Sequence, residues 1–254
     1  MKNIEKSYSI ILPTYNEAGH IKKLIHEIYD IFSKNDILFE IIIVDDHSSD
    51  GTINIIDELC AKNKNIEKII RYNKKSSLVN SLNEGIFHSN YENIIWMDAD
   101  YSHPPKFLNH FFEQKDQEFD VIVFSRFLKD SRRYFDKEGL SPKFIDKLSF
   151  ILNQFCKFFL YKNFTDYTSG FICIKKSIID NYNLTGYYGD YFIRLINYCF
   201  LKQARIIELP FTELDRLTGY SKTTSNKLNF LVKCYFYLYT IIECYLKKVF
   251  KITK

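Results

Sequence analysis

The chain has 254 residues, of which 46% are hydrophobic, so it is long and apolar enough for one large domain or two small ones. Its formal net charge of +4 is too small to indicate a nucleic-acid-binding protein. The six cysteines show no metal-binding spacing and are interpreted as reduced thiols of a cytoplasmic protein. We expect no signal peptide, because the N-terminal residues are polar, and no spanning helix, because no uncharged run reaches about 18–20 apolar residues.

Strands and helices are expected to alternate through the first hundred or so residues. Apolar runs predict buried strands at Tyr8–Leu12, Ile37–Val44, Ile66–Tyr72 and Ile94–Met97. A 3.6-residue apolar period predicts helices over Ile21–Phe32, up to Leu59, and over Leu78–His88. We expect Pro13 to end the first strand, and Asp50 or Ser49 to cap the second helix. This alternation predicts an α/β fold with a parallel, doubly wound sheet.

The second half is expected to add further helices and strands and an amphipathic C-terminal segment. Helices are predicted at Phe107–Phe112, Phe144–Tyr161 and Tyr191–Leu201, and strands at Val121–Phe124, Phe171–Ile174 and Ile206–Leu209. We expect residues 1–225 to form the globular domain and residues 226–254 a helical segment. The aromatic residues, leucines and lysines of Leu228–Phe250 suit a helix in a membrane interface, with Phe144–Tyr161 as a second apolar face. They suit equally a helix packed on the domain or on a second copy.

Two carboxylates follow the fourth predicted strand, in the sequence Asp98-Ala99-Asp100. Residues two apart in extended chain point to the same side, so both carboxylates can face one point. Like charges held that close repel unless a cation lies between them, and oxygen ligands suit Mg²⁺ or Mn²⁺. Acidic and polar residues also follow the first and second strands, at the edge where ligands collect in parallel sheets. The sequence therefore predicts a divalent-metal site at this edge.

Six motifs in order resemble a known enzyme family. They are PTYNE, DDHSSDGT, MDADYSHPP, SR, DYTSGF and ELP-x5-R-x2-GYSK, over residues 8–222. Together they resemble the inverting family two glycosyltransferases of GT-A fold, and within them the dolichol-phosphate or polyprenyl-phosphate mannosyltransferases. The resemblance implies a GT-A (Rossmann-like) sheet and a nucleotide-sugar donor, GDP-mannose or a UDP-hexose. It also implies a lipid-phosphate acceptor and attachment at the cytoplasmic membrane face.

The resemblance also implies roles for particular residues. Nucleotide-binding residues would be Pro13, Tyr15, Glu17, Asp45, Asp46 and Asp98, and the metal ligands would be Asp98 and Asp100. The catalytic set would be Asp98 and Asp100 with the cations Arg126, Arg216 and Lys222. Residues on the acceptor side would be Ser125, Asp166, Ser169, Asp190 and Ser221, of which Asp166 reads equally as a structural turn residue.

Three departures from the family pattern concern the donor and the acceptor. A Gly-rich segment is replaced by Ser77–Ser81, Ile172 stands where many relatives have Arg, and Arg194 where they often have Glu. One alternative is therefore transfer onto a sugar hydroxyl, which requires a base such as Asp190 or Asp166. Another is a catalytically weak protein that binds nucleotide sugars. The oligomeric state is left open.

Overall fold

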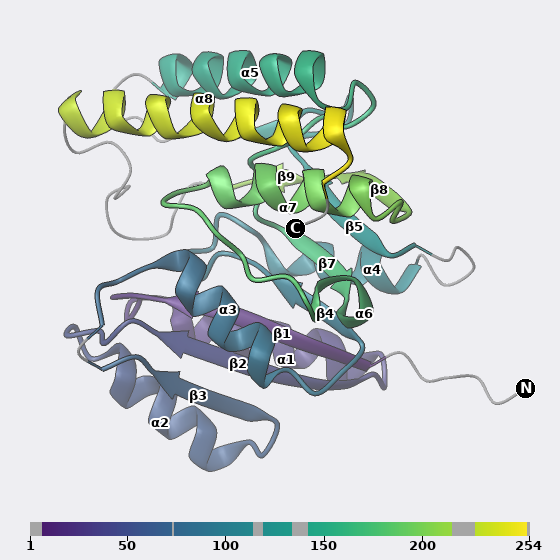
Figure 1. Cartoon of the computed structure of the whole chain (residues 1–254). Coiled ribbons are helices and arrows are strands. Elements are labelled where there is room, and N and C mark those ends of the chain that lie inside the picture. The colour runs from purple at the N-terminus through teal and green to yellow at the C-terminus, as the bar shows by residue number, and fades with distance from the viewer. Residues whose placement is uncertain (1–6, 73, 114–118, 134–141, 215–226, 253–254) are drawn as a thin grey trace, which may run out of the picture.

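The computed structural model describes residues 7–72, 74–113, 119–133, 142–214 and 227–252. Within these ranges the strands of the main sheet are β1 (Ser7–Thr14), β2 (Leu38–Asp45), β3 (Ile66–Ile70), β4 (Asn93–Trp96), β5 (Val121–Ser125), β7 (Ile172–Lys175) and β8 (Ile206–Pro210). Their order in space is β3-β2-β1-β4-β7-β5-β8 (Figure 1). A separate two-stranded sheet joins β6 (Arg132–Arg133) to β9 (Thr212–Glu213).

The main sheet is mostly parallel, as predicted. β1 pairs in parallel with β2 and β4, β2 with β3, and β5 with β8, whereas β7 runs antiparallel between β4 and β5. The loops that follow β1, β2, β4 and β5 therefore leave the sheet at one edge, and the segment that precedes β7 enters at the same edge. Parallel α/β sheets bind their ligands at this edge.

The prediction that Pro13 ends the first strand is wrong, because β1 continues to Thr14. Thr14 faces β2, since its carbonyl oxygen accepts the N–H of Asp46. Successive residues of a strand face opposite neighbours, so Pro13 faces the side of β4. The pairing of β1 with β4 ends at Ile11 and Trp96, and the missing N–H of Pro13 costs no ladder hydrogen bond there.

Helices cover both faces of the sheet. One face carries α1 (Ile21–Lys34), α2 (Thr52–Lys62), the 3₁₀ helix η1 (Pro105–Leu108) and α4 (Asn109–Glu113), and the other α3 (Leu78–His88) and α7 (Asp190–Leu201); α6 (Lys176–Ile179) is a single turn after β7. Alternate residues of β1 enter different cores, with Ile10 and Leu12 on the α1 side and Ile11 on the α3 side. Burial on both faces explains the continuous apolar runs from which the strands were predicted.

Two long helices, α5 (Pro142–Phe159) and α8 (Lys227–Phe250), lie side by side beyond α7 (Figure 1). The inner face of α8 joins the core of α7 through Ile241 and Cys244, which are 4% and 1% exposed. Arg194 of α7 forms an ion pair with Glu243 of α8. Lys248 donates to carbonyl oxygens at the end of α5. None of the described helices is both long and apolar enough to cross a membrane.

Candidate active site

The loops that follow β1 and β2 hold one another in place. The N–H of Asn16 donates to Ser48 Oγ at 2.7 Å, and the N–H of Glu17 donates to Thr52 Oγ1 at 2.8 Å. Asn16 has a φ of 58°, a left-handed conformation that asparagine tolerates better than most residues. Tyr15 and Glu17, which were predicted to contact the nucleotide, are half-buried on this braced loop.

Asp45 is used within its own turn. Its side chain is fully buried, its Oδ1 accepts the N–H of Ser48 at 2.7 Å, and its Oδ2 accepts the Ser48 hydroxyl at 2.6 Å. Burial raises the pKa of Asp45, and the two bonds from Ser48 oppose that rise. Both oxygens are thus committed to the loop, so Asp45 shapes the turn that presents the next residue.

Asp46 is held by an arginine that sequence reasoning missed. Arg71, which follows β3 and is 3% exposed, forms a buried ion pair with Asp46 and donates to Ser81 Oγ at 2.9 Å. The Asp46 carboxylate also accepts the N–H of Ser77 at 2.7 Å and the hydroxyl of Ser81 at 3.1 Å. The serines that replace the family's Gly-rich segment therefore orient this carboxylate. A lone arginine after a weak strand carries no signal of this contact in the sequence.

Asp98 and Asp100 lie beyond the fourth strand, with Asp100 in a turn. β4 ends at Trp96, two residues before Asp98, so the alternation of an extended strand does not apply to the two residues, and that both carboxylates face one point stays a prediction. Asp100 is 4% exposed, and its Oδ1 accepts the N–H of Ser102 at 3.0 Å. The carbonyl oxygen of Ser102 in turn accepts the N–H of Leu214 at 3.1 Å. The turn, and not the strand, therefore fixes the Asp100 side chain.

His103 fixes the start of this turn. Its Nδ1 accepts the N–H of Asp98 at 3.0 Å, so the ring carries its proton on Nε2. The ring stacks on Phe171 with centroids 4.9 Å apart and an interplanar angle of 14°, and it meets Phe211 edge-on at 5.7 Å. His103 is 1% exposed and thereby ties the Asp98 backbone to the aromatic core.

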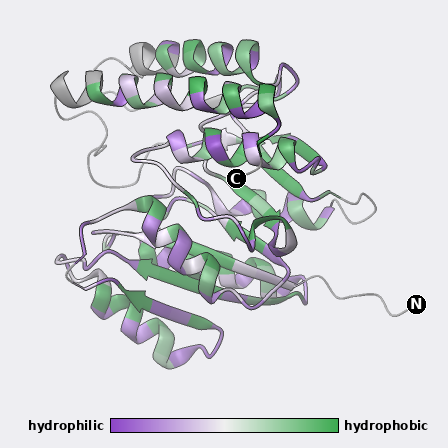
Figure 2. Ribbon diagram, viewed as in Figure 1, coloured by the Kyte–Doolittle hydropathy of each residue, from purple (hydrophilic) through white to green (hydrophobic). Residues whose placement is uncertain are grey.

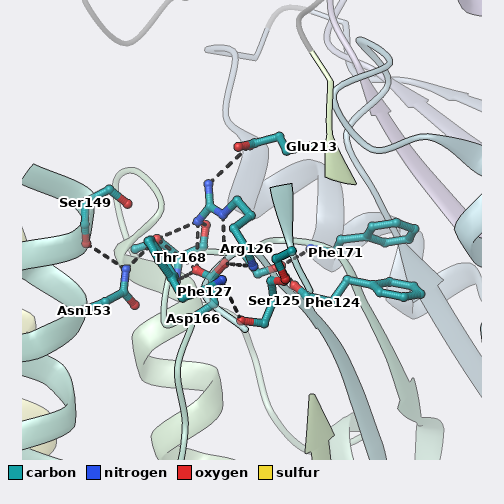
Figure 3. Close-up of polar contacts among 12 residues, drawn as sticks. Phe124, Ser125, Arg126, Phe127, Ser149, Asn153, Asp166, Thr168, Phe171 and Glu213 are labelled. Carbon is teal, nitrogen blue, oxygen red and sulfur yellow. Dashed lines mark hydrogen bonds and ion pairs between the residues drawn. The ribbon is translucent and has the colours of Figure 1, made fainter. Parts of the chain in front are cut away.

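Arg126, predicted to face phosphate, is paired with carboxylates at the end of β5 (Figure 3). Its Nε donates to Asp166 Oδ2 and its Nη2 to Asp166 Oδ1, each at 2.8 Å, and its Nη1 lies 3.3 Å from Glu213 Oε1. Its Nη2 also donates to the Thr168 carbonyl oxygen at 2.8 Å. Burial raises the pKa of Asp166, but the Arg126 charge, the Arg126 hydrogen bonds and the N–H of Thr168 together outweigh burial and hold that pKa below its ordinary value.

The loop that carries Asp166 is anchored by Glu208 of β8. Glu208 accepts the N–H of Asp166 at 3.0 Å and both the N–H and the hydroxyl of Thr165, at 2.8 and 2.7 Å. The hydroxyl of Ser125 lies 2.6 Å from that of Thr165, and the hydroxyl of Ser169 donates to the carbonyl oxygen of Phe124. Ser125, Asp166 and Ser169 are thus brought together, and hydrogen bonds within the fold engage all three.

Asp190 stands at the start of α7 and is fully buried. Its Oδ1 accepts the N–H groups of Tyr187 and Tyr188 at 3.1 and 2.7 Å, and its Oδ2 lies 3.3 Å from Thr240 Oγ1 of α8. Oδ1 therefore stabilises the loop before α7, and Oδ2 links the start of α7 to α8. Three other predicted residues, Arg216, Ser221 and Lys222, lie outside the described residues.

Comparison with known proteins identifies the family. The model of the family described as "Glycosyl transferase family 2" matches residues 9–182. The chain belongs to glycosyl transferase family 2. It is 26% identical over 214 residues to the dolichol-phosphate mannosyltransferase of Pyrococcus furiosus. This alignment covers 84% of this chain and 58% of the Pyrococcus protein. It is 25% identical over 230 residues to the polyprenol monophosphomannose synthase of Mycolicibacterium smegmatis, with 86% and 82% covered.

The chain spans 58% of the length of the Pyrococcus protein. It spans 40% of the Saccharomyces cerevisiae dolichol-phosphate mannosyltransferase, to which it is 33% identical over 111 residues.

Solved structures with the same fold include glucosyl-3-phosphoglycerate synthase from Mycobacterium tuberculosis, in complex with Mn²⁺, UDP and glucosyl-3-phosphoglycerate. It is 15% identical, with a TM-score of 0.67 and coverage of 94% of this chain and 80% of that one. Mannosyl-3-phosphoglycerate synthase from Rubrobacter xylanophilus gives a TM-score of 0.65 at 14% identity.

The carboxylate ligands that this chain offers fit a hard divalent cation. Asp98 and Asp100 supply carboxylate oxygens, which Mg²⁺ and Mn²⁺ prefer, and neighbouring coordination positions would be completed by phosphate oxygens and water. No group of three or more His, Cys, Asp or Glu side chains is suited to a metal in the part of the chain that the structure describes.

Proposed function

We propose that this protein transfers a hexosyl group, with inversion, from a nucleoside diphosphate sugar such as GDP-mannose or a UDP-hexose to a polyprenyl phosphate at a membrane surface. Its membership of glycosyl transferase family 2 supports the reaction class. The names of its relatives, which are dolichol-phosphate and polyprenol mannosyltransferases, support the acceptor. In the reaction, an acceptor phosphate oxygen bonds to the anomeric carbon while the bond from that carbon to the nucleoside diphosphate breaks.

One observation favours a phosphate over a hydroxyl as the acceptor. A sugar hydroxyl must lose a proton to a base, and the two candidate bases are Asp166 and Asp190. Asp166 is paired with Arg126, and both oxygens of Asp190 are engaged by backbone N–H groups and Thr240. A phosphate monoester has a second pKa of about 6, so at neutral pH it is already a nucleophilic dianion and requires no base.

Each group of residues would then have one task. Tyr15, Glu17 and Asp46 would hold the nucleoside, and Asp98 and Asp100 would hold the divalent ion. Bound there, that ion would neutralise negative charge on the leaving diphosphate. Arg126 would meet the acceptor phosphate through Nη1, together with Arg216 and Lys222, because Arg suits bidentate phosphate contact and Lys acts as a point charge.

The outer faces of α5 and α8 support attachment to a membrane surface. Apolar residues of α8 repeat at helical spacing on its exposed side: Tyr235, Leu238, Tyr239, Ile242, Tyr245, Leu246 and Val249, which are 40–63% exposed. On α5, Phe150, Ile151, Phe155 and Phe158 are 48–83% exposed. Figure 2 shows hydrophobic turns alternating with hydrophilic ones along both helices, which lie next to each other. Large exposed apolar patches are uncommon on monomeric soluble proteins and often mark a membrane or protein interaction site.

The acceptor is tested by incubating the protein with labelled GDP-mannose, UDP-glucose or UDP-galactose, Mn²⁺, and vesicles that contain a polyprenyl phosphate. We expect labelled lipid from one donor, and none when the lipid is the polyprenol without its phosphate. Labelling of a soluble sugar or of 3-phosphoglycerate, with the lipid phosphate ignored, would refute the proposed acceptor. Nucleotide binding without transfer to any of them would favour the weak-binder alternative.

Membrane attachment is tested with the double variant Leu238→Asp/Ile242→Asp, whose exposed positions leave the core intact. Two charges on the apolar face should lower co-sedimentation with vesicles at least tenfold, because burying each side chain contributes about 1.5–3 kcal/mol. The control is Phe87→Asp on α3, an 83% exposed residue away from α5 and α8, which should bind like the wild type. Salt should weaken binding only partly, since Lys247 pairs with Glu243 and Lys248 donates to α5. Equal binding by all three proteins would exclude this face.

A further inference from the structure

The segment from Gly186 to Asp190, immediately before α7, is fixed in one conformation. Asp190 Oδ1 accepts the N–H groups of Tyr187 and Tyr188. Gly186 has a φ of 150°, and a Cβ built there would lie 2.9 Å from the backbone nitrogen of Tyr191 and 3.0 Å from Asp190 Oδ2. Only glycine fits this position, so the segment is packed tightly on the start of α7.

The inner face of α8 covers this segment. Four residues of α8 at helical spacing touch it: Phe236 meets the Tyr187 ring at 4.3 Å, the Lys233 ammonium lies 4.7 Å from the Tyr188 ring centre, Thr240 reaches Asp190, and Tyr237 reaches Gly189. Gly189 leaves no room for a side chain, since a Cβ there would lie 2.6 Å from the Tyr237 hydroxyl and 3.7 Å from its ring carbon Cζ. The C-terminal helix therefore holds the loop that begins α7.

The next residue, Tyr191, points to the turn that carries Asp98. Tyr191 is 3% exposed. Its hydroxyl and the His103 ring both flank Gly170: a Cβ built on Gly170 would lie 3.6 Å from the hydroxyl and 4.0 Å from the ring. His103 in turn accepts the N–H of Asp98. The buried indole N–H of Trp96 comes near the same hydroxyl, although it makes no hydrogen bond of standard geometry within the described residues.

The Tyr191 hydroxyl can act as a hydrogen-bond donor. A tyrosine hydroxyl carries its proton near neutral pH, because its ordinary pKa is about 10. The Asp98 carboxylate is close enough to act on this hydroxyl electrostatically. Sequence motifs gave no reason to single out this tyrosine.

We propose that Tyr191 is a positioning residue of the donor site, that its hydroxyl donates to the Asp98 carboxylate or to the donor diphosphate, and that α8 sets its place through the segment 186–190. The inference rests on the donor site of the proposed function. It adds that the helix whose outer face would meet the membrane also completes the catalytic centre with its inner face.

The first test is Tyr191→Phe, which removes the hydroxyl and keeps the ring. Trp96 is the only tryptophan of the chain, so its emission reports on this site both without ligand and during titration with Mn²⁺ and UDP or GDP. We expect a changed emission of the free variant, about ten- to a hundredfold weaker binding of Mn²⁺ with the nucleotide, and a similar loss in kcat. The control is Tyr198→Phe, on the same helix but stacked on Tyr182, which should match the wild type. Unchanged emission and unchanged binding of Tyr191→Phe would overturn the assignment.

The second test examines the part played by α8. Gly189→Ala places a methyl group against the Tyr237 hydroxyl and should displace the segment, so that Mn²⁺-nucleotide binding weakens as in Tyr191→Phe. Gly189→Ala combined with Tyr237→Phe removes the clash, because 3.7 Å to the ring is an ordinary contact, and should restore binding. If Gly189→Ala binds like the wild type, or if the double variant is not rescued, α8 does not set this site.

The two tests separate this inference from the acceptor assignment. Trp96 emission and Mn²⁺-nucleotide binding require no acceptor, so they decide the role of Tyr191 even if the lipid phosphate proves to be the wrong substrate. Conversely, the wild type could transfer sugar to a lipid phosphate while Tyr191→Phe shows the same emission and the same Mn²⁺-nucleotide binding as the wild type. The proposed function would then stand, and the role of Tyr191 would fall.

Discussion

Asp98→Ala and Asp100→Ala are each expected to abolish sugar transfer while the chain stays folded. The two carboxylates are the proposed ligands of the divalent ion that neutralises charge on the leaving diphosphate, an effect worth several kcal/mol. Because about 1.4 kcal/mol corresponds to a factor of ten in rate, each variant should lose on the order of a hundredfold or more in kcat. Initial rates at saturating donor over a range of Mn²⁺ and Mg²⁺ concentrations measure this loss.

The fold should survive these substitutions because both residues follow β4 at the edge of the sheet and neither belongs to the two hydrophobic cores. Asp98 is half-buried, and the bond that Asp100 accepts from Ser102 contributes only about 0.5–1.5 kcal/mol. Asp30→Ala, an exposed carboxylate on α1, serves as the matched control and should keep full activity. Undiminished transfer by the wild type in EDTA would contradict the proposed metal site.

Arg126→Ala is expected to destabilise the protein by about 3–5 kcal/mol, because it leaves the buried Asp166 carboxylate without its counter-charge. Removing Asp166 as well should recover much of this loss, so Arg126→Met/Asp166→Asn should be more stable than Arg126→Ala. The control is Arg205→Ala, whose pair with Asp120 is exposed and should contribute only about 0–1 kcal/mol. Urea denaturation gives the free energies of unfolding.

The effect of Arg126 on stability should depend on pH in a defined direction. Since the charge and hydrogen bonds of Arg126, together with the Thr168 N–H, outweigh burial and lower the pKa of Asp166 from its ordinary value, the folded state favours the ionised carboxylate. The stability that the pair supplies is therefore present above about pH 4, and it is lost as the pH falls through the folded-state pKa. The difference between wild type and Arg126→Ala should be largest near neutrality and shrink below about pH 4. A difference that grew on acidification would mean that Asp166 is not ionised in the fold.

Measurements of kcat/KM should show whether Arg126 contacts the acceptor phosphate or only supports the fold. If its Nη1 meets the acceptor phosphate, Arg126→Lys should remain folded yet lose about ten- to a hundredfold in kcat/KM for the acceptor, because Lys cannot bond two carboxylates and a phosphate at once. Nucleotide affinity should change much less. Equal losses for donor and acceptor would assign Arg126 to the framework that Asp166, Glu208 and Glu213 build around it.

The fold class and the location of the site could be predicted from local pattern alone. Apolar runs of strand length separated by helical periods require a sheet buried on both faces. Such a sheet places the loops that follow β1, β2 and β4 at one edge. The acidic residues of those loops, among them Asp46 and Asp98, lie at the same edge for that reason.

Contacts between distant segments could not be predicted, because each side of such a contact is unremarkable in its own sequence context. Arg71 is a lone cation after a weak strand until the fold places it against Asp46. Likewise, Arg126 looks like a free phosphate ligand until β9 and the loop before β7 bring Glu213 and Asp166 to it. Charge neutralisation depends on three-dimensional distance, which the order of residues does not specify.

The C-terminal helix α8 was likewise predicted in part from the sequence and in part decided by tertiary packing. Its composition predicted an amphipathic helix, but apolar residues lie on both of its sides, so the period could not tell which side enters the core. Packing on α7 buries Ile241 and Cys244 and leaves Leu238 and Ile242 exposed. Only the tertiary structure decided this, because a residue is buried by whatever the fold brings opposite it, and the elements opposite α8 come from parts of the chain far away in sequence.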